Sequence, residues 1–185
     1  MNSNPVIKPK VATPALTLAS AAVLIFVAYF AVAIATSSPL SGPFLLGDLA
    51  ALVAVVVLGW VWLVRSRRHT AWMTAAREKW NQFDDAKRTH RTTTEVTVVS
   101  VDALEPTGSW ITINWNRFNH VQQAWIEALP EPIWPGSVLL ISPDPDQVGP
   151  GAPWPQTYYI QAPRCLAWAP TKRPGHFGKH GLNMR

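Results

Sequence analysis

The chain has 185 residues, of which 48% are hydrophobic and 15% are charged, and its formal net charge is +5. That charge is uneven, because the stretch 93–170 has two basic and seven acidic residues whereas the rest of the chain carries +10. An acidic domain argues against nucleic acid as a partner, and the single cysteine, Cys165, excludes an intrachain disulfide and a metal site built from several cysteines.

Two apolar segments follow a short N-terminal segment, residues 1–12. We expect residues 13–36 and 44–64 to be transmembrane helices and residues 37–43 to be the external loop between them. Each has about the 20 residues that a helix needs to cross ~30 Å of hydrocarbon. Lipid offers the backbone no hydrogen bonds, so the sequence predicts a two-helix transmembrane hairpin.

Basic residues flank this hairpin, and the loop between its helices has none. They are Lys8, Lys10, Arg65, Arg67 and Arg68. Because positive residues stay in the cytoplasm, we expect a multi-pass protein of a bacterial cytoplasmic (inner) membrane, with the N-terminus and the C-terminal domain inside. A signal peptide cleaved after Ala33-Ile34-Ala35 is the alternative, and it would leave one span.

Asp48 is the one charged residue between Lys10 and Arg65. A carboxylate in lipid is costly, which makes Asp48 a candidate for contact with another membrane subunit. The alternative is that it lies at the headgroup level, near a helix N-terminus whose dipole favours negative charge.

Residues 65–92 contain no glycine or proline and are rich in basic residues. Trp72, Ala76, Trp80 and Phe83 recur at helical spacing, which predicts an amphipathic juxtamembrane helix. Two interpretations stay open: the stripe lies on lipid, or it packs on the protein's own domain. In the first case anionic lipid headgroups are partners, and the candidate contacts are Arg65, Arg67, Arg68, Arg77 and Lys79.

The stretch 93–170 reads as short strands separated by turns, which predicts a small cytoplasmic SH3- or OB-like β-barrel. The fold class expected of the whole chain is therefore an α+β membrane protein. For 121–129 we favour a strand, although a helix also fits the pattern. The expected strands and breaks are Val96–Val101 with a bulge at Val98–Val99, a turn at Glu105–Ser109, Trp110–Trp115, Val121–Leu129, Ser137–Ser142, and a last strand from Thr157 to Trp168 broken at Pro163.

Six of the ten tryptophans fall in this domain, and core packing is the default interpretation of each. Trp134 and Trp154 differ because they lie in proline-rich loops. We expect these two to be exposed anchors for another protein. Residues 171–185 form a basic tail that we expect to be flexible.

A resemblance rests on the segment Trp134-Pro-Gly-Ser-Val-Leu-Leu-Ile-Ser-Pro-Asp-Pro-Asp146. It resembles a pattern in bacterial membrane-anchored small β-barrel domains of unknown function, with a Gly-x-Val-x-Val…Asp-Pro signature. Gly136, Val138, Leu140, Asp144 and Pro145 carry the likeness, and Ser142-Pro143 departs from it. The resemblance supports the fold and implies no activity.

No glycine-rich phosphate loop or nucleophile elbow is present in the sequence. We expect no cofactor and no metal, and Asp144 and Asp146 read as turn formers between prolines. The favoured function is a non-enzymatic accessory or assembly subunit of a larger membrane complex, whose partners are other integral membrane subunits. The alternative is an autonomous membrane-anchored adaptor or sensor whose β domain binds a peptide, lipid or nucleotide, and an enzyme ranks third.

Overall fold

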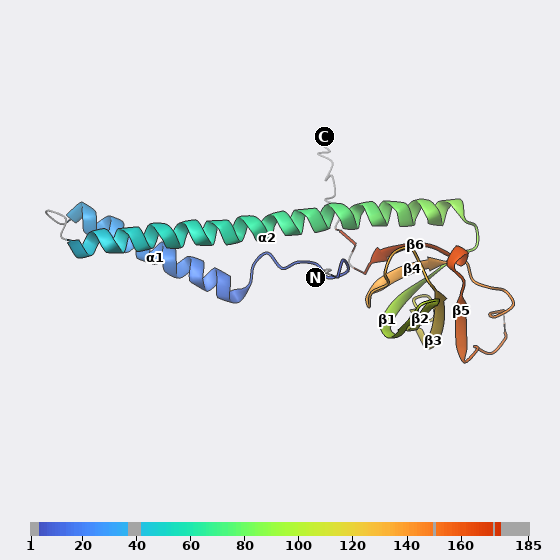
Figure 1. Ribbon diagram of the computed structural model, residues 1–185. Coiled ribbons are helices and arrows are strands. Elements are labelled where there is room, and N and C mark those ends of the chain that lie inside the picture. The colour runs from blue at the N-terminus through green and yellow to red at the C-terminus, as the bar shows by residue number, and fades with distance from the viewer. Residues whose placement is uncertain (1–3, 37–41, 150, 172, 175–185) are drawn as a thin grey trace, which may run out of the picture. The chain divides into compact units, whose positions relative to one another are not determined.

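The structure is a computed structural model that describes residues 4–36, 42–149, 151–171, 173 and 174 (Figure 1). It divides into a helix unit, residues 9–71, and a sheet unit, residues 72–185 with the N-terminal residues up to Lys8. The elements in chain order are α1 Pro14–Thr36, α2 Gly42–Thr89, β1 Thr94–Glu105, β2 Gly108–Trp115, β3 His120–Glu127, β4 Ser137–Ile141, β5 Thr157–Ile160, the 3-10 turn η1 Ala162–Arg164 and β6 Cys165–Pro170.

The helix unit is the antiparallel pair formed by α1 and the first part of α2. Gly47 lies so close to Phe30 that a Cβ there would come within 2.5 Å of the phenyl ring. Further along, the Trp62 indole donates to Ser20 Oγ at 3.0 Å and the Arg65 guanidinium donates to Thr13 Oγ1 at 3.3 Å. Contacts that run in opposite directions along the two helices confirm an antiparallel helix pair, and its insertion in a membrane stays a prediction.

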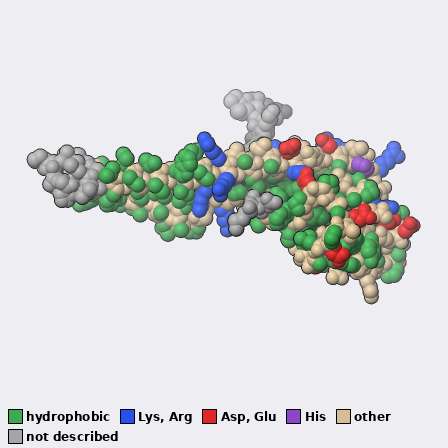
Figure 2. Space-filling view, viewed as in Figure 1, with side chains coloured by type: hydrophobic (Ala, Val, Ile, Leu, Met, Phe, Trp, Pro, Cys, Tyr) green, Lys and Arg blue, Asp and Glu red, His purple; other side chains and the backbone are tan. Residues whose placement is uncertain are grey.

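The surface of the helix unit is apolar. Leu18 is 71% exposed, Ile25 is 72% exposed and Trp60 is 66% exposed. Figure 2 shows these helices covered with hydrophobic side chains up to a group of basic side chains. In the sequence Arg65, Arg67 and Arg68 follow the second apolar segment. Both helices are long and apolar enough to cross a membrane, and only 6% of the apolar segment of each is buried.

The C-terminal part of α2, from Trp72 onward, belongs to the sheet unit. The helix runs without a break to Thr89, so the helix expected over residues 65–92 is present but ends three residues earlier. Phe83 is 1% exposed and, with Trp80 and Ala86 at its sides, packs against β4 and β6 through Val138, Leu140 and Ala169. Of the two interpretations of the aromatic stripe, the structure therefore favours packing on the protein's own domain (Figure 1).

One six-stranded sheet forms the rest of this unit, in the order β5-β3-β2-β1-β4-β6. Among the strands that the structure describes, only β5 and β3 pair in parallel. The expected closed barrel is wrong, because β5 and β6 end the sheet without pairing to each other. At β5 the Gln147 carboxamide takes the place of a further strand: it accepts from Tyr159 N at 2.7 Å and donates to Tyr159 O at 3.0 Å.

The main core lies inside the curve of this open sheet. Strands β1 to β5 all contribute fully buried side chains to it, including Val96, Ile111, Ile126 and Ile160. Strand β4 is buried on both faces, since Leu139 points to this core and Leu140 to α2. A strand covered on both sides is apolar without alternation, which explains the sequence of Ser137–Ile141.

Several local expectations are confirmed. The bulge in β1 appears as a register shift between Val98 and Ser100, and His120–Glu127 is a strand. The prediction of one last strand from Thr157 to Trp168 is wrong. Thr157–Ile160 and Cys165–Pro170 are two separate strands at opposite edges of the sheet. The turn Ala162–Arg164, with Pro163 inside it, leads the chain from one edge to the other.

Candidate partner-binding cavity

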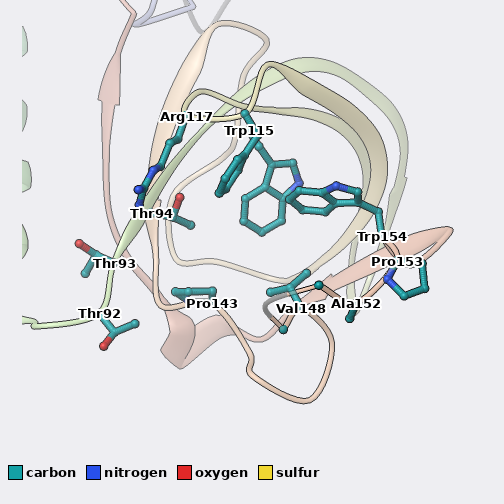
Figure 3. A pocket seen from close by; sticks show the side chains of 13 residues that line it. Thr92, Thr93, Thr94, Trp115, Arg117, Pro143, Val148, Ala152, Pro153 and Trp154 are labelled. Carbon is teal, nitrogen blue, oxygen red and sulfur yellow. The ribbon is translucent and has the colours of Figure 1, made fainter.

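A cavity of about 620 Å³ opens beside the end of β2, between the chain that enters β1 and the loop that follows β4 (Figure 3). We call it the Trp154 cavity. Its walls come from the strand entrance Thr92–Thr94, the hairpin residues Trp115, Arg117 and Phe118, and the loop residues Pro143, Val148 and Ala152–Trp154.

Aromatic rings make the apolar part of this cavity. The Trp154 ring lies 5.2 Å from that of Trp115 and 5.6 Å from that of Phe118, and it stacks on His120 at 4.5 Å. Trp115 is fixed, since it is 2% exposed and its indole donates to Gln122 Oε1 at 3.1 Å. Trp154 and Phe118 remain 39% and 56% exposed. The site therefore has a rigid floor with two accessible rings above it.

Asp144 holds the loop that carries Trp154. Its carboxylate accepts from the backbone N–H of Asp146 and from the Gln147 carboxamide, both at 3.2 Å, and lies 3.3 Å from the Arg164 guanidinium. The Gln147 bond, the Asp146 N–H and the charge of Arg164 together hold the pKa of Asp144 below its usual value. The backbone N–H of Asp144 donates to the buried Tyr158 hydroxyl at 2.9 Å. The expected turn-forming role of Asp144 is confirmed.

The polar part of the cavity consists of the three threonines and Arg117, which is one of two basic residues in the stretch 93–170. The Arg117 guanidinium lies 5.7 Å from the Phe118 ring centre. Aromatic rings with one cation beside them suit an extended segment with apolar side chains and a negative group.

The two tryptophans expected to be protein anchors are in different places. Trp154 lines the cavity, whereas Trp134 is partly buried in a separate apolar hollow of about 280 Å³ with Pro5, Trp72 and Trp168. Sequence reasoning missed Phe118 and His120 as neighbours of Trp154. The turn 116–119 places Phe118 and His120 near each other, but the sequence contains no signal that brings this turn to Trp154.

The residues predicted to contact lipid headgroups also lie in different environments. Arg67, Arg68 and Arg77 are exposed, while Lys79 forms an ion pair with Glu131 at 2.8 Å and lies 4.9 Å from the Trp168 ring centre. The hydrogen bond from Lys79 lowers the pKa of the Glu131 carboxyl, and the bond from Trp168 lowers it further by a smaller amount, although partial desolvation raises it. Lys79 thus holds the helix to the sheet, and headgroup contact stays a prediction for the arginines.

Asp48 lies in α2, and its side chain is outside the described residues. Burial raises the pKa of the Cys165 thiol to about 11, so the thiol is protonated and unreactive at neutral pH. In the part of the chain that the structure describes, no three His, Cys, Asp or Glu side chains gather as a metal site would need.

No protein-family model, curated protein or solved structure matches the chain. The likeness carried by Gly136, Val138 and Asp144 therefore identifies no family, and the function has to be argued from the cavity itself.

Proposed function

We propose that this protein is a non-enzymatic, membrane-anchored accessory subunit whose sheet unit binds a segment of a partner protein in the Trp154 cavity. The cavity carries the proposal. It combines a fixed aromatic floor, two accessible rings and a loop held in place by Asp144. Interfaces between proteins are dominated by such aromatic side chains in preformed pockets.

The exposed apolar surface of α1 and the first part of α2 supports the membrane anchor. In this proposal both helices span the cytoplasmic membrane of a bacterium. The basic residues at Lys8, Lys10 and Arg65–Arg68 then keep both chain ends inside. Asp48 would face a hydrogen-bond donor on a neighbouring membrane subunit, a contact that adds only ~0.6–2 kcal/mol.

An extended, proline-containing or otherwise apolar segment is the ligand class that fits the cavity best. Such segments lose little conformational entropy on binding and stack their side chains on aromatic rings. Arg117 would add an attraction for an acidic residue or a chain-terminal carboxylate at one end of the segment.

The test is a mild-detergent purification of the full chain and of the variant Trp154→Ala, followed by mass spectrometry. We expect the native chain to retain a stoichiometric partner and the variant to lose it by about tenfold or more, as for a central aromatic anchor. Leu104→Ala is the matched control, because Leu104 is 78% exposed and absent from the cavity lining.

Two results would count against the proposal. If the native chain purifies alone, the autonomous adaptor replaces the accessory subunit. If Trp154→Ala and Leu104→Ala retain equal amounts of partner, the cavity is not the binding site.

A further inference from the structure

A row of three aromatic side chains crosses the sheet on the face opposite the main core. Trp110 on β2 is in register with Trp125 on β3, and Trp125 is in register with Tyr159 on β5. The two indoles lie 5.1 Å apart at an interplanar angle of 66°, so they form a corner instead of a flat stack. Tyr159 is 52% exposed. These rings border a cavity of about 410 Å³.

Gly108 explains how the Trp125 ring is placed. A Cβ at Gly108 would lie 2.6 Å from the Trp125 ring and 2.4 Å from Ile126 O, so no side chain fits there. The indole covers the glycine instead, and this fixes the corner that it forms with Trp110.

Two carboxylates stand beside this glycine. Glu105 on β1 and Glu127 on β3 are each in register with Gly108, one on either side. Both side chains are exposed and both border the same cavity. Each carboxylate uses one oxygen internally: Glu105 accepts from the Trp110 indole at 3.2 Å and Glu127 accepts from Ala162 N at 2.8 Å. Among the described residues neither is paired with a cation.

We infer that this corner is a second binding site, which takes the side chain of an arginine or lysine from a basic segment of a partner protein. The cation lies over the faces of Trp125 and Tyr159, and the free oxygens of Glu105 and Glu127 balance its charge. A cation is attracted to an aromatic face by the ring quadrupole, and nearby carboxylates add to that attraction. The site is separate from the Trp154 cavity and does not rest on the function proposed for it.

Charge favours a basic protein segment over the other source of an organic cation, a choline headgroup. The stretch 93–170 has seven acidic and two basic residues, and the described residues that border this cavity include no arginine or lysine. A lipid headgroup brings a phosphate with its ammonium group, and nothing in the cavity lining would hold that phosphate. A basic peptide brings only positive charge.

The probe is a dye-labelled peptide of four alternating Arg-Gly pairs, and its binding to the full chain in detergent micelles is followed by fluorescence anisotropy. A Ser-Gly peptide of equal length is the neutral control. We expect binding of the arginine peptide only. Tyr159→Leu and the double variant Glu105→Gln/Glu127→Gln should each weaken it by about threefold or more.

Matched variants separate the site from general attraction to an acidic domain. Glu95→Gln/Asp146→Asn removes the same charge elsewhere, and Val121→Ala shortens an exposed apolar side chain that borders neither cavity; both should leave the affinity unchanged. Equal losses in the two charge variants, or full affinity in Tyr159→Leu, would overturn the inference. Displacement of the peptide by glycerophosphocholine at lower concentrations than by free arginine amide would overturn it in favour of a lipid headgroup.

Discussion

The helix unit and the sheet unit place the same kinds of side chain in opposite environments. In the helix unit Leu18 and Ile25 are more than two-thirds exposed, whereas in the sheet unit Ile111 and Ile113 are fully buried. Apart from the buried Asp144, the described charged residues of the sheet unit are at least partly exposed, while the apolar part of the helix unit has almost none (Figure 2).

This difference indicates that the two units are suited to different solvents. A domain that folds in water buries its large aliphatic side chains, because each one contributes about 1.5–3 kcal/mol to stability when it leaves water. The helix unit gains little of this by itself, and its exposed aliphatic surface is typical of helices that contact lipid. The C-terminal part of α2 resembles the sheet unit in this respect, since Phe83 is buried against the sheet.

The largest effect is expected where α2 packs on the sheet. Phe83→Ala should lower the free energy of unfolding of the sheet unit by about 3–5 kcal/mol, because it leaves a cavity beside Val138 and Leu140. Leu104→Ala, at an exposed position, should change it by less than ~0.5 kcal/mol. Denaturant titration of tryptophan fluorescence measures both. If Phe83→Ala and Leu104→Ala are equally stable, the C-terminal part of α2 does not contribute to the stability of the sheet unit.

A charge on the exposed surface of α1 should have the next largest effect. Ile25→Arg places a cation at the middle of the apolar helix, which should cost about 2.5–3.5 kcal/mol of membrane insertion. Val121→Arg, at an exposed position of the sheet, should cost nothing. The measurement is the fraction of each variant that alkaline carbonate extracts from membranes. If both variants extract like the native chain, the surface of α1 does not contact lipid.

A smaller effect is expected at Asp144, within the sheet unit. Its carboxyl pKa is lowered in the folded state, so it stabilises the fold above its ordinary value of 3.8, and this contribution is lost as pH falls through the lowered pKa. Asp144→Ala should therefore lower the melting temperature at neutral pH and converge with the native chain at strongly acid pH. Arg164→Gln, which removes the ion pair and the bond to Pro143 O but leaves the other bonds of Asp144, should lower the melting temperature less. A difference that persists unchanged in acid would contradict this role.

The sequence predicted the elements better than their assembly. Periodicity located the apolar helices, the bulge at Val98 and the turn after Glu105, because each depends on residues close in the chain. Whether the sheet closes into a barrel depends on contacts between residues far apart in the chain. The Gln147 carboxamide binds the free edge of β5 at Tyr159, and no pattern of neighbouring residues predicts this contact. Trp154 was predicted as an anchor from its proline-rich loop, but its neighbours Phe118 and His120 come from a hairpin more than thirty residues away.

The most direct test of the membrane-anchored account is the side of the membrane on which the sheet unit lies. Two fusions after Arg185 suffice, one with a reporter active only inside the cytoplasm and one with a reporter active only outside it. The basic residues around Lys8 and Arg65 predict that the first is active and the second is silent. Activity of the external reporter would contradict the account, because the Trp154 cavity would then face the wrong side for a cytoplasmic partner.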